Sequence, residues 1–388
     1  MTFSDPIEEE TLPRYRPDDY FPVSIGQVFN EKFKILAKLG FGSESTTWLA
    51  KDLTRWRFQN NRFVALKILT KNAKDNRSAL SELALSKQIA EADPKHEGLR
   101  YVRTVLESFE IESQRGIHLC LVYELMRETL STFQRRLRHG CIPGNLLKPL
   151  LRFLLTGLDY LHTQCHIIHT DLKPENILLG IEDERIIHEL IQEEEKDPTP
   201  AKIYNDRRIY PHRNFGNLRG APGRPKIGDF GLAIRSSQHM YSHPIQPDCL
   251  QAPEVILRAG WSYSADIWNL GVMVWDLLEG RALFDAWNPE AEDYAANMHL
   301  AEMISVLGPP PELLLLRGQL TSHFFTSEGD LIVGKAAKPR YSGLDDTITM
   351  LSGDDKRNFL RFIARMLEWL PEDRATAKEL LADPWLDS

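Results

Sequence analysis

The chain has 388 residues, 42% of them hydrophobic and 26% charged, and a formal net charge of −8. This length allows two lobes with separate cores, and the composition is ordinary for a soluble globular protein. A mildly acidic chain is a poor candidate for binding nucleic acid through phosphate neutralisation, and it suits basic peptide substrates better.

Cysteine usage and the N-terminal residues argue against a secreted or membrane protein. The cysteines are Cys120, Cys141, Cys165 and Cys249. No two of them have metal-ligand spacing and nothing suggests a disulfide framework, so we expect reduced thiols in the cytoplasm and nucleus. The first ten residues are acidic and polar, unlike a signal peptide, and the most apolar stretch, Leu146 to Leu161, is broken by charges and a proline. We therefore expect no membrane segment.

The first third of the chain predicts a small β-rich lobe. Residues 1–28 are rich in acidic residues and proline, so we expect an arm with little regular structure. Strand patterns then follow at residues 34–39, 46–50, 63–69 and 117–125, with a helical pattern at 77–92. We assign residues 29–126 to this N-terminal lobe.

The remainder, residues 127–388, predicts a mostly helical lobe, which makes the chain an α+β protein. Helical spacing of apolar residues recurs at 146–162, 265–278, 295–307 and 355–367. Residues 181–224 interrupt this lobe with a charged helical stretch and then a loop rich in Pro, Gly, Arg and Asn. We interpret them as a surface insertion that takes no part in chemistry.

The first chemical motif is a glycine turn between two strands, Leu39-Gly40-Phe41-Gly42-Ser43-Glu44-Ser45. Two glycines allow the backbone N–H groups to approach a phosphate closely. A Gly-x-Gly turn is also typical of an ordinary tight hairpin, and Ser45 stands where a third glycine often occurs. This motif alone therefore does not distinguish a phosphate-binding loop from a hairpin, and its interpretation depends on the motifs that follow it.

Lys67 lies inside the apolar strand Val64-Ala65-Leu66-Lys67, so its ammonium group must reach an anion. The alternative is a lysine at a sheet edge that extends its side chain to water. We expect Glu82 on the next helix to be its partner, with Glu91 as a second choice. Such an ion pair would hold the ammonium group against the α- and β-phosphates of a nucleotide.

The most specific string is His169-Thr170-Asp171-Leu172-Lys173-Pro174-Glu175-Asn176. Asp171 can accept the proton of an attacking hydroxyl, and Lys173 can neutralise charge on a transferring phosphoryl group. The side-chain oxygen of Asn176 can bind a divalent metal. Metal-assisted phosphoryl transfer needs these parts and little covalent chemistry. The alternative, a capped turn between a helix and a hairpin, explains none of the spacing.

Asp229, in the string Gly228-Asp229-Phe230-Gly231, supplies the second expected Mg²⁺ ligand, in a position to bridge the β- and γ-phosphates. Three later residues have structural roles in our interpretation. Glu254 and Arg374 form a buried ion pair, and Asp266 accepts hydrogen bonds from the backbone around Asp171, although a surface position for Asp266 is an alternative.

In content, order and spacing, these motifs resemble the eukaryotic protein kinase superfamily. The resemblance covers residues 29–388 and implies a two-lobed kinase fold that binds ATP and Mg²⁺ in the cleft, with Asp171, Lys173 and Lys67 as catalytic residues. It places the hinge at residues 124–126 and the gatekeeper at Tyr123. The nucleotide site that it implies comprises Leu39, Gly40, Gly42, Ser45, Ala65, Lys67, Glu82, Tyr123, Glu124, Met126, Asn176 and Asp229, with Asn176 and Asp229 as metal ligands.

Within the superfamily the chain looks most like the SR-protein kinases, which phosphorylate serines in arginine/serine-rich splicing factors. Six strings carry this likeness. They are Tyr20-Phe21-Pro22-Val23 before the first strand, Leu39-Gly40-Phe41-Gly42 followed by Ser45-Thr46 and Trp48-Leu49, His169-Thr170-Asp171, Phe324-Phe325-Thr326 with Gly329-Asp330-Leu331, Leu370-Pro371-Glu372-Asp373-Arg374-Ala375-Thr376-Ala377, and Pro384-Trp385-Leu386. The insertion stands where that family carries a spacer between its lobes, and it is short for such a spacer. The likeness implies basic Arg/Ser-rich protein substrates, no direct binding of nucleic acid or membrane, and a monomer in the cytoplasm and nucleus.

Some positions depart from the family pattern. Glu44 and Thr47 replace residues that are apolar in most glycine loops, which predicts looser ATP binding. The acidic groove that would bind arginine-rich peptides is represented only by Glu290, Glu292 and Asp293. Because Thr170 stands where most kinases have arginine, we expect activity without phosphorylation at Ser236, Ser237, Tyr241 or Ser242.

Two other functions are weighed against an active protein kinase. A pseudokinase would bind partners without turnover, and it would lack the lysine, the base or the metal ligands, all of which are present here. A small-molecule kinase of related fold would usually lack the Lys173-Pro174-Glu175-Asn176 and Ala252-Pro253-Glu254 strings, which are also present.

Overall fold

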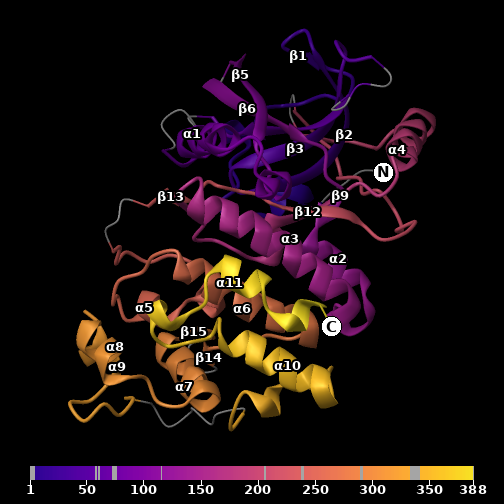
Figure 1. Ribbon diagram of the computed structural model, residues 1–388. Coiled ribbons are helices and arrows are strands. Elements are labelled where there is room, and N and C mark those ends of the chain that lie inside the picture. Colours follow the sequence, from indigo (N-terminus) through magenta and orange to yellow (C-terminus); the bar gives the residue numbers. More distant parts are fainter. Residues whose placement is uncertain are drawn as a thin grey trace.

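The computed structural model describes residues 5–56, 59, 62–71, 77–114, 116–204, 207–236, 240–288, 292–332 and 341–387. Two lobes are evident in Figure 1, with the β-rich lobe above and the helical lobe below. The two-lobed α+β fold expected from the sequence is thereby confirmed. Within the described ranges, no helix has both the length and the apolar character needed to cross a bilayer.

The upper lobe is built on a six-stranded antiparallel sheet with the order β1-β2-β3-β4-β6-β5. Its strands are β1 (Val28–Phe29), β2 (Phe33–Gly42), β3 (Ser45–Asp52), β4 (Phe63–Leu69), β5 (Val105–Ser113) and β6 (Gly116–Glu124). The four strands predicted from the sequence are confirmed as β2, β3, β4 and β6. The predicted helix is α1 (Arg77–Ala92), and its bounds agree with the prediction. Phe33 and Ile35 of β2 are buried in one apolar cluster, whereas Ala37, beyond a register shift in the strand, is buried in another cluster together with Ala65 and Tyr123.

The lower lobe packs helices around a buried central helix, α6 (Ser264–Glu279), nearly all of whose side chains are buried. The other helices are α2 (Leu130–Arg136), α3 (Gly144–Thr163), α5 (Pro253–Ile256), α7 (Ala296–Leu307), α8 (Glu312–Arg317), α9 (Thr321–Phe324), α10 (Gly353–Ala364) and α11 (Ala377–Leu381). Leucines at helical spacing along α3, such as Leu147, Leu151 and Leu154, form the apolar stripe that meets this core.

Short strands at the junction of the lobes bring the chemical motifs together. They are β7 (Glu128–Thr129), β8 (Ile167–Ile168), β9 (Ile177–Gly180), β12 (Gly223–Ile227) and β13 (Ile234–Arg235). The pairings are β12-β9-β7 and β13-β8. Ile177 faces Ile227 in the β9–β12 register, and the Gly228 N–H donates to the Asn176 carbonyl at 2.8 Å. Two segments about fifty residues apart are therefore fixed side by side, and each carries a predicted metal ligand.

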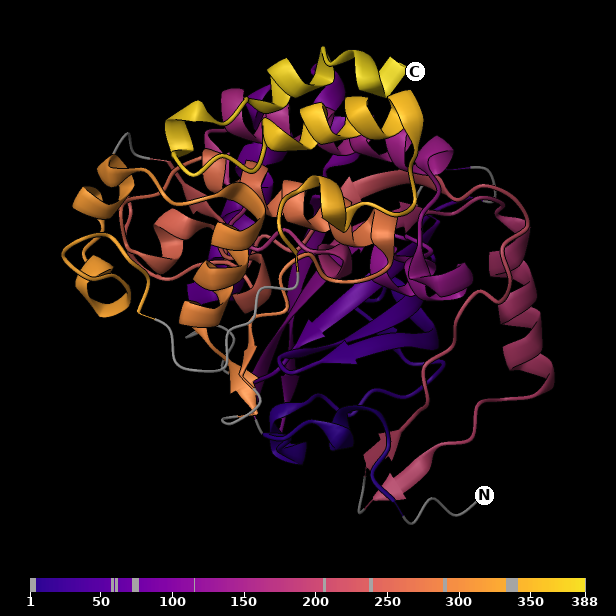
Figure 2. The same ribbon diagram turned by 90° about the horizontal axis from the view of Figure 1, so that it is seen from below.

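The insertion is part of the packed fold. It contains α4 (Arg185–Lys196), β10 (Lys202–Tyr204) and β11 (Arg207–Ile209). In α4, Ile186, Ile187 and Leu190 are buried in the same apolar cluster as Ala65 and Tyr123 of the upper lobe. Figure 2 shows the β10–β11 hairpin beside the N-terminal segment. In the described part of that segment, regular structure consists of two short 3-10 turns, at Glu8–Thr11 and Pro17–Asp19.

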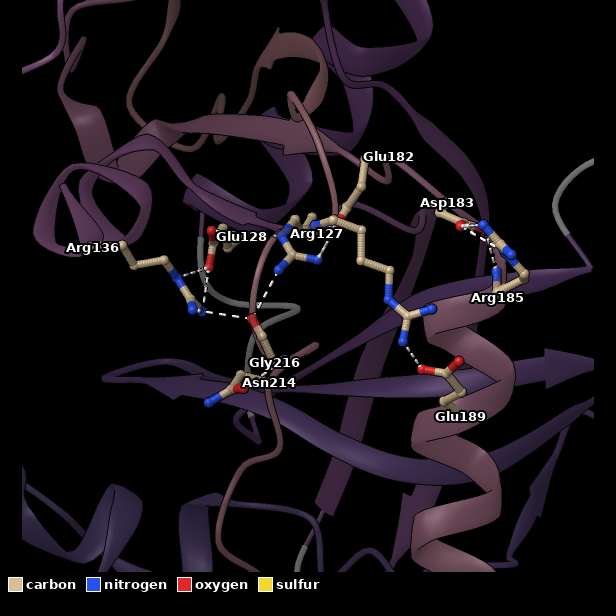
Figure 3. Close-up of polar contacts among 10 residues, drawn as sticks. Arg127, Glu128, Arg136, Glu182, Asp183, Arg185, Glu189, Asn214 and Gly216 are labelled. Atoms are coloured by element: carbon tan, nitrogen blue, oxygen red, sulfur yellow. Dashed lines mark hydrogen bonds and ion pairs between the residues drawn. The ribbon is translucent and has the colours of Figure 1, made fainter.

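Polar contacts attach the insertion to the lower lobe as well (Figure 3). The guanidinium group of Arg127, directly after the hinge, donates to Glu182 at 2.8 Å and to the Gly216 carbonyl at 2.9 Å. Arg136 of α2 binds Glu128 at 2.9 Å and the same Gly216 carbonyl at 3.0 Å. The insertion therefore contacts both lobes across the hinge.

Candidate active site

The loop that carries Asp171 is held from below by Asp266 of α6. The buried carboxylate of Asp266 accepts the N–H groups of His169 at 2.8 Å and Thr170 at 2.9 Å. Thr170 has a φ of 66°, a conformation that β-branched residues rarely adopt, so these two bonds offset local strain. The predicted contact of Asp266 with this backbone is confirmed, and the surface alternative is wrong.

Asp171, Lys173 and Asn176 form one hydrogen-bonded group. The Lys173 ammonium group lies 2.8 Å from Asp171 Oδ2, and Asn176 Nδ2 donates to the same oxygen at 2.9 Å. Because Asn176 donates through its nitrogen, its side-chain oxygen is the atom suited to a hard cation such as Mg²⁺. The Asp171 carboxylate is thus oriented by two donors at the base of the cleft.

The anionic partner of Lys67 comes from α1. Lys67 Nζ lies 3.2 Å from Glu82 Oε2 and 3.9 Å from Asp229 Oδ1. The alternative partner, Glu91, pairs instead with Lys87 of its own helix at 4.0 Å. The predicted Lys67–Glu82 ion pair is therefore confirmed. Lys67 of β4, Glu82 of α1 and Asp229 of the lower lobe therefore meet at one place in the cleft.

The gatekeeper position is linked to the same group. The Tyr123 hydroxyl donates to the second carboxylate oxygen of Glu82. Burial, reinforced by the Glu82 carboxylate, raises the pKa of Tyr123 well above its ordinary value, so the hydroxyl stays protonated and remains a donor. Glu82 is therefore held by a donor on each oxygen.

The glycine turn has room for a phosphate. A Cβ at Gly40 would meet nothing within 4 Å, and one at Gly42 would meet only Ser45 Oγ at 3.9 Å. Packing therefore does not require glycine at either position, whereas close approach of a phosphate to the backbone does. Together with the carboxylate and amide ligands of Asp229 and Asn176, this arrangement fits ATP with Mg²⁺.

The remaining predicted nucleotide residues lie along the same cleft. Leu39, Ala65 and Tyr123 belong to one apolar cluster, in which Ala65 faces Tyr123 across the β4–β6 pair. Met126 is buried in the hinge. The side chain of Glu124 pairs with Lys226 at 2.5 Å, so at the hinge its backbone is the part suited to an adenine base.

These findings can be set beside known proteins. The protein kinase domain family matches residues 33–386. The chain belongs to the protein kinase family. A serine/threonine protein kinase of Aspergillus fumigatus is 38% identical, with coverage of 98% of this chain and 91% of the relative. Serine/threonine-protein kinase SRPK of Physarum polycephalum is 31% identical with the same coverage, and SRSF protein kinase 3 of Mus musculus is 25% identical over 99% and 91%.

A solved kinase domain agrees with this fold. Its crystal structure matches with a TM-score of 0.71 at 24% identity, covering 95% of this chain and 98% of that one. The likeness to the protein kinase superfamily, and within it to the SR-protein kinases, is thus confirmed, and the names of the relatives support a protein serine/threonine kinase.

The predicted Glu254–Arg374 ion pair lies below the kinase active site and joins α5 to the chain before α11. Two nitrogens of Arg374 bind the two carboxylate oxygens of Glu254 at 2.5 and 2.7 Å, and both side chains are buried. The guanidinium group also lies 4.9 Å from the ring centroid of Trp268. This prediction is confirmed.

The acidic residues expected to bind arginine-rich peptides fall at a short hairpin of the lower lobe. Glu290 lies outside the described residues, whereas Glu292 and Asp293 are exposed near the β14 (Trp287–Asn288) and β15 (Asp293–Tyr294) hairpin. Their role in this kinase stays a prediction.

Sequence reasoning missed two residues next to the kinase cleft. The guanidinium group of Arg103 donates to the Glu124 carbonyl at 3.0 Å and lies 4.4 Å from the Tyr123 ring centroid. Arg103 therefore supports the hinge. Tyr20 of the N-terminal arm reaches the glycine turn. Arg103 belongs to no motif. Tyr20 belongs to the string Tyr20-Phe21-Pro22-Val23 that resembles the SR-protein kinases, but no local pattern indicates its contact with the glycine turn.

Proposed function

We propose that this kinase transfers the γ-phosphate of ATP to serine or threonine hydroxyls in basic, arginine/serine-rich proteins such as splicing factors. The observation that carries the proposal is the convergence of Lys67, Asp171, Asn176 and Asp229 on one cleft from three separate segments: strand β4, the loop at residues 169–176 and the turn after β12. Bound Mg²⁺ would neutralise charge on the β- and γ-phosphates. Asn176 and Asp229 are the residues that would hold it.

Each catalytic residue has a defined task in this proposal. Asp171 accepts the proton of the substrate hydroxyl and orients it toward the γ-phosphate. Lys173, 2.8 Å from that carboxylate, stabilises negative charge on the phosphoryl group as it moves. Lys67, held by Glu82, positions the α- and β-phosphates.

The substrate class is supported by two observations. The names of related kinases refer to SR-type substrates, as in SRSF protein kinase 3 of Mus musculus. The chain also carries a net charge of −8, which favours encounter with cationic peptides. The pseudokinase alternative has no support, because the lysine, the base and both metal ligands are present and adjacent.

The test compares phosphate transfer from labelled ATP to two matched peptides, one with arginine and one with proline after the target serine. We expect the arginine peptide to be the better substrate. Asp171→Asn should lower turnover roughly 10²- to 10⁴-fold and leave ATP binding largely intact. A preference for proline would refute the substrate class, and full activity of the Asp171 variant would remove that residue from the mechanism.

A further inference from the structure

The tip of the glycine turn is held by a residue from outside the two lobes. The hydroxyl of Tyr20, in the N-terminal arm, lies 3.0 Å from the Gly42 carbonyl and 2.8 Å from the Ser43 carbonyl. Tyr20 is 4% exposed, and burial raises its pKa to about 12, so the hydroxyl is a proton donor at neutral pH. On the other side of the tip, the Thr70 N–H donates to the Glu44 carbonyl at 2.9 Å.

The backbone around Tyr20 is fixed by the insertion. Arg207 of β11 is 3% exposed, and its guanidinium group donates to the carbonyls of Tyr20, at 2.8 Å, and Pro17. The same guanidinium group lies 5.8 Å from the Tyr20 ring centroid. Next to Tyr20, the Asp19 carbonyl accepts the Lys71 N–H at 2.7 Å and ties the arm to the end of β4.

A second contact attaches the arm to the strand that leads into the glycine turn. Lys38 of β2 is 1% exposed, and its ammonium group pairs with Glu9 and, at 3.4 Å, with Glu8. Glu8 also pairs with His212 of the insertion at 3.0 Å. Arm, strand and insertion are therefore connected by charged groups as well as by Tyr20, as their proximity in Figure 2 illustrates.

We propose that Tyr20 is a positioning residue for the nucleotide phosphates, acting through the carbonyls of Gly42 and Ser43, and that Arg207 holds it in place. The backbone carbonyls at the tip point to Tyr20, which orients the peptide groups of the turn. Since a loop with two glycines is otherwise free to adopt many conformations, this restraint lowers the entropy that is lost when phosphates bind. The insertion thus acts on nucleotide binding, in contrast to the inert role that the sequence suggested.

The inference deepens the proposed function, because it concerns the ATP site of the same kinase, but its test does not require a protein substrate. The affinities for MgATP and for adenosine are measured by calorimetry on the full chain and on Tyr20→Phe. We expect MgATP binding to weaken roughly two- to tenfold, the amount associated with one hydrogen bond, and adenosine binding to stay unchanged. In the kinase assay, KM for ATP should rise by the same factor with little change in kcat.

The chain offers a matched control in Tyr15. Its ring lies 5.2 Å from that of Tyr20, and its buried hydroxyl has no hydrogen-bond partner among the described residues. Tyr15→Phe removes the same atom from the same arm, so it should change neither affinity. Arg207→Lys, which keeps the charge but loses the two-carbonyl geometry, should weaken MgATP binding in the same direction as Tyr20→Phe.

The inference is overturned if Tyr20→Phe binds MgATP as the unmodified chain does. It is equally overturned if adenosine and MgATP weaken together with a fall in melting temperature, since that pattern indicates general destabilisation. Failure to phosphorylate an arginine-rich peptide would refute the proposed substrate class while leaving the nucleotide affinities, and hence this inference, intact.

Discussion

Two residues of the active site occupy the left-handed region of backbone conformation although neither is glycine. Thr170 has a φ of 66° and Asp229 a φ of 62°. Such conformations cost on the order of 1–3 kcal/mol each and persist where the surroundings impose them. Asp266 holds the first through two hydrogen bonds. Beside the second, Phe230 is buried with its ring centroid 5.2 Å from that of His169.

Thr170 also determines how the segment after Asp229 is attached. Its hydroxyl donates to the Leu232 carbonyl at 2.8 Å, and the Ser236 N–H donates to the His166 carbonyl at 2.8 Å. Further along, the ring of Tyr241 stacks on Trp261 with centroids 4.9 Å apart. These contacts hold the described parts of the segment, before residue 237 and after residue 239, and the first of them comes from Thr170 itself.

We therefore expect phosphatase treatment to leave kinase activity unchanged within about twofold, because Thr170 has no positive charge with which to bind a phosphate on this segment. Activity toward a peptide is measured before and after treatment, with mass spectrometry to verify that Ser236, Tyr241 and Ser242 are unmodified. Ser237, the fourth site considered, lies outside the described residues. A large loss of activity on dephosphorylation would contradict the expectation.

Among the secondary structure elements, the central helix α6 and the short helix α5 lie below the active site and support it. The sequence predicted α6 well, because apolar residues recur at helical spacing from residue 265 to residue 278 and few polar residues interrupt them. The sequence also predicted the contact of Asp266 with the backbone around Asp171, nearly one hundred positions earlier. A surface position stayed open as an alternative, because a local pattern does not determine how α6 packs against that loop.

At the same scale, the Glu254–Arg374 pair joins α5 to the chain before α11. Glu254→Gln would leave a buried guanidinium group without its counter-charge, so we expect a loss of about 3–5 kcal/mol in the free energy of unfolding. The loss is measured by urea denaturation. Arg317→Ala, which breaks the half-exposed pair with Glu372, is the control and should cost no more than about 1 kcal/mol. Equal effects of the two variants would show that the buried pair is not needed for stability.

Across the whole molecule, the parts predicted from the sequence are those that depend on local patterns. Strands β2, β3, β4 and β6 follow from short runs rich in apolar and β-branched residues, and the string at residues 169–176 by itself indicates phosphoryl-transfer chemistry. Strand β5, at the edge of the sheet, was not predicted, although Phe109-Glu110-Ile111-Glu112 alternates as a half-exposed strand does.

The contacts of the arm and the insertion could not be predicted, because they join residues far apart in the chain. Arg207 reaches back 187 positions to Tyr20, and Arg127 reaches forward 89 to Gly216. Polar segments of this composition are typical of exposed loops, and their burial depends on surfaces that form only in the complete fold. The spacing of the kinase motifs, by contrast, can be recognised directly in the amino-acid sequence.

A buried histidine of α7 should contribute to the pH dependence of stability. His299 of α7 is fully buried, with the Tyr294 hydroxyl 3.2 Å from Nδ1 and the Phe284 ring beside it. Burial lowers its pKa from 6.5 to about 3. Between these values the unfolded chain binds a proton that the folded chain does not, so the free energy of unfolding falls as pH falls below 6.5.

From this one group we expect a loss of about 1.4 kcal/mol between pH 7.5 and pH 5.5. His299→Gln removes the titrating group, so its free energy of unfolding should fall less over that interval, even where the variant is less stable at pH 7.5. The measurement is a pair of urea titrations at the two pH values, with His323→Gln as the control because His323 is exposed on α9. If the difference between the two pH values is the same in His299→Gln as in the unmodified chain, the acid sensitivity of the fold originates elsewhere.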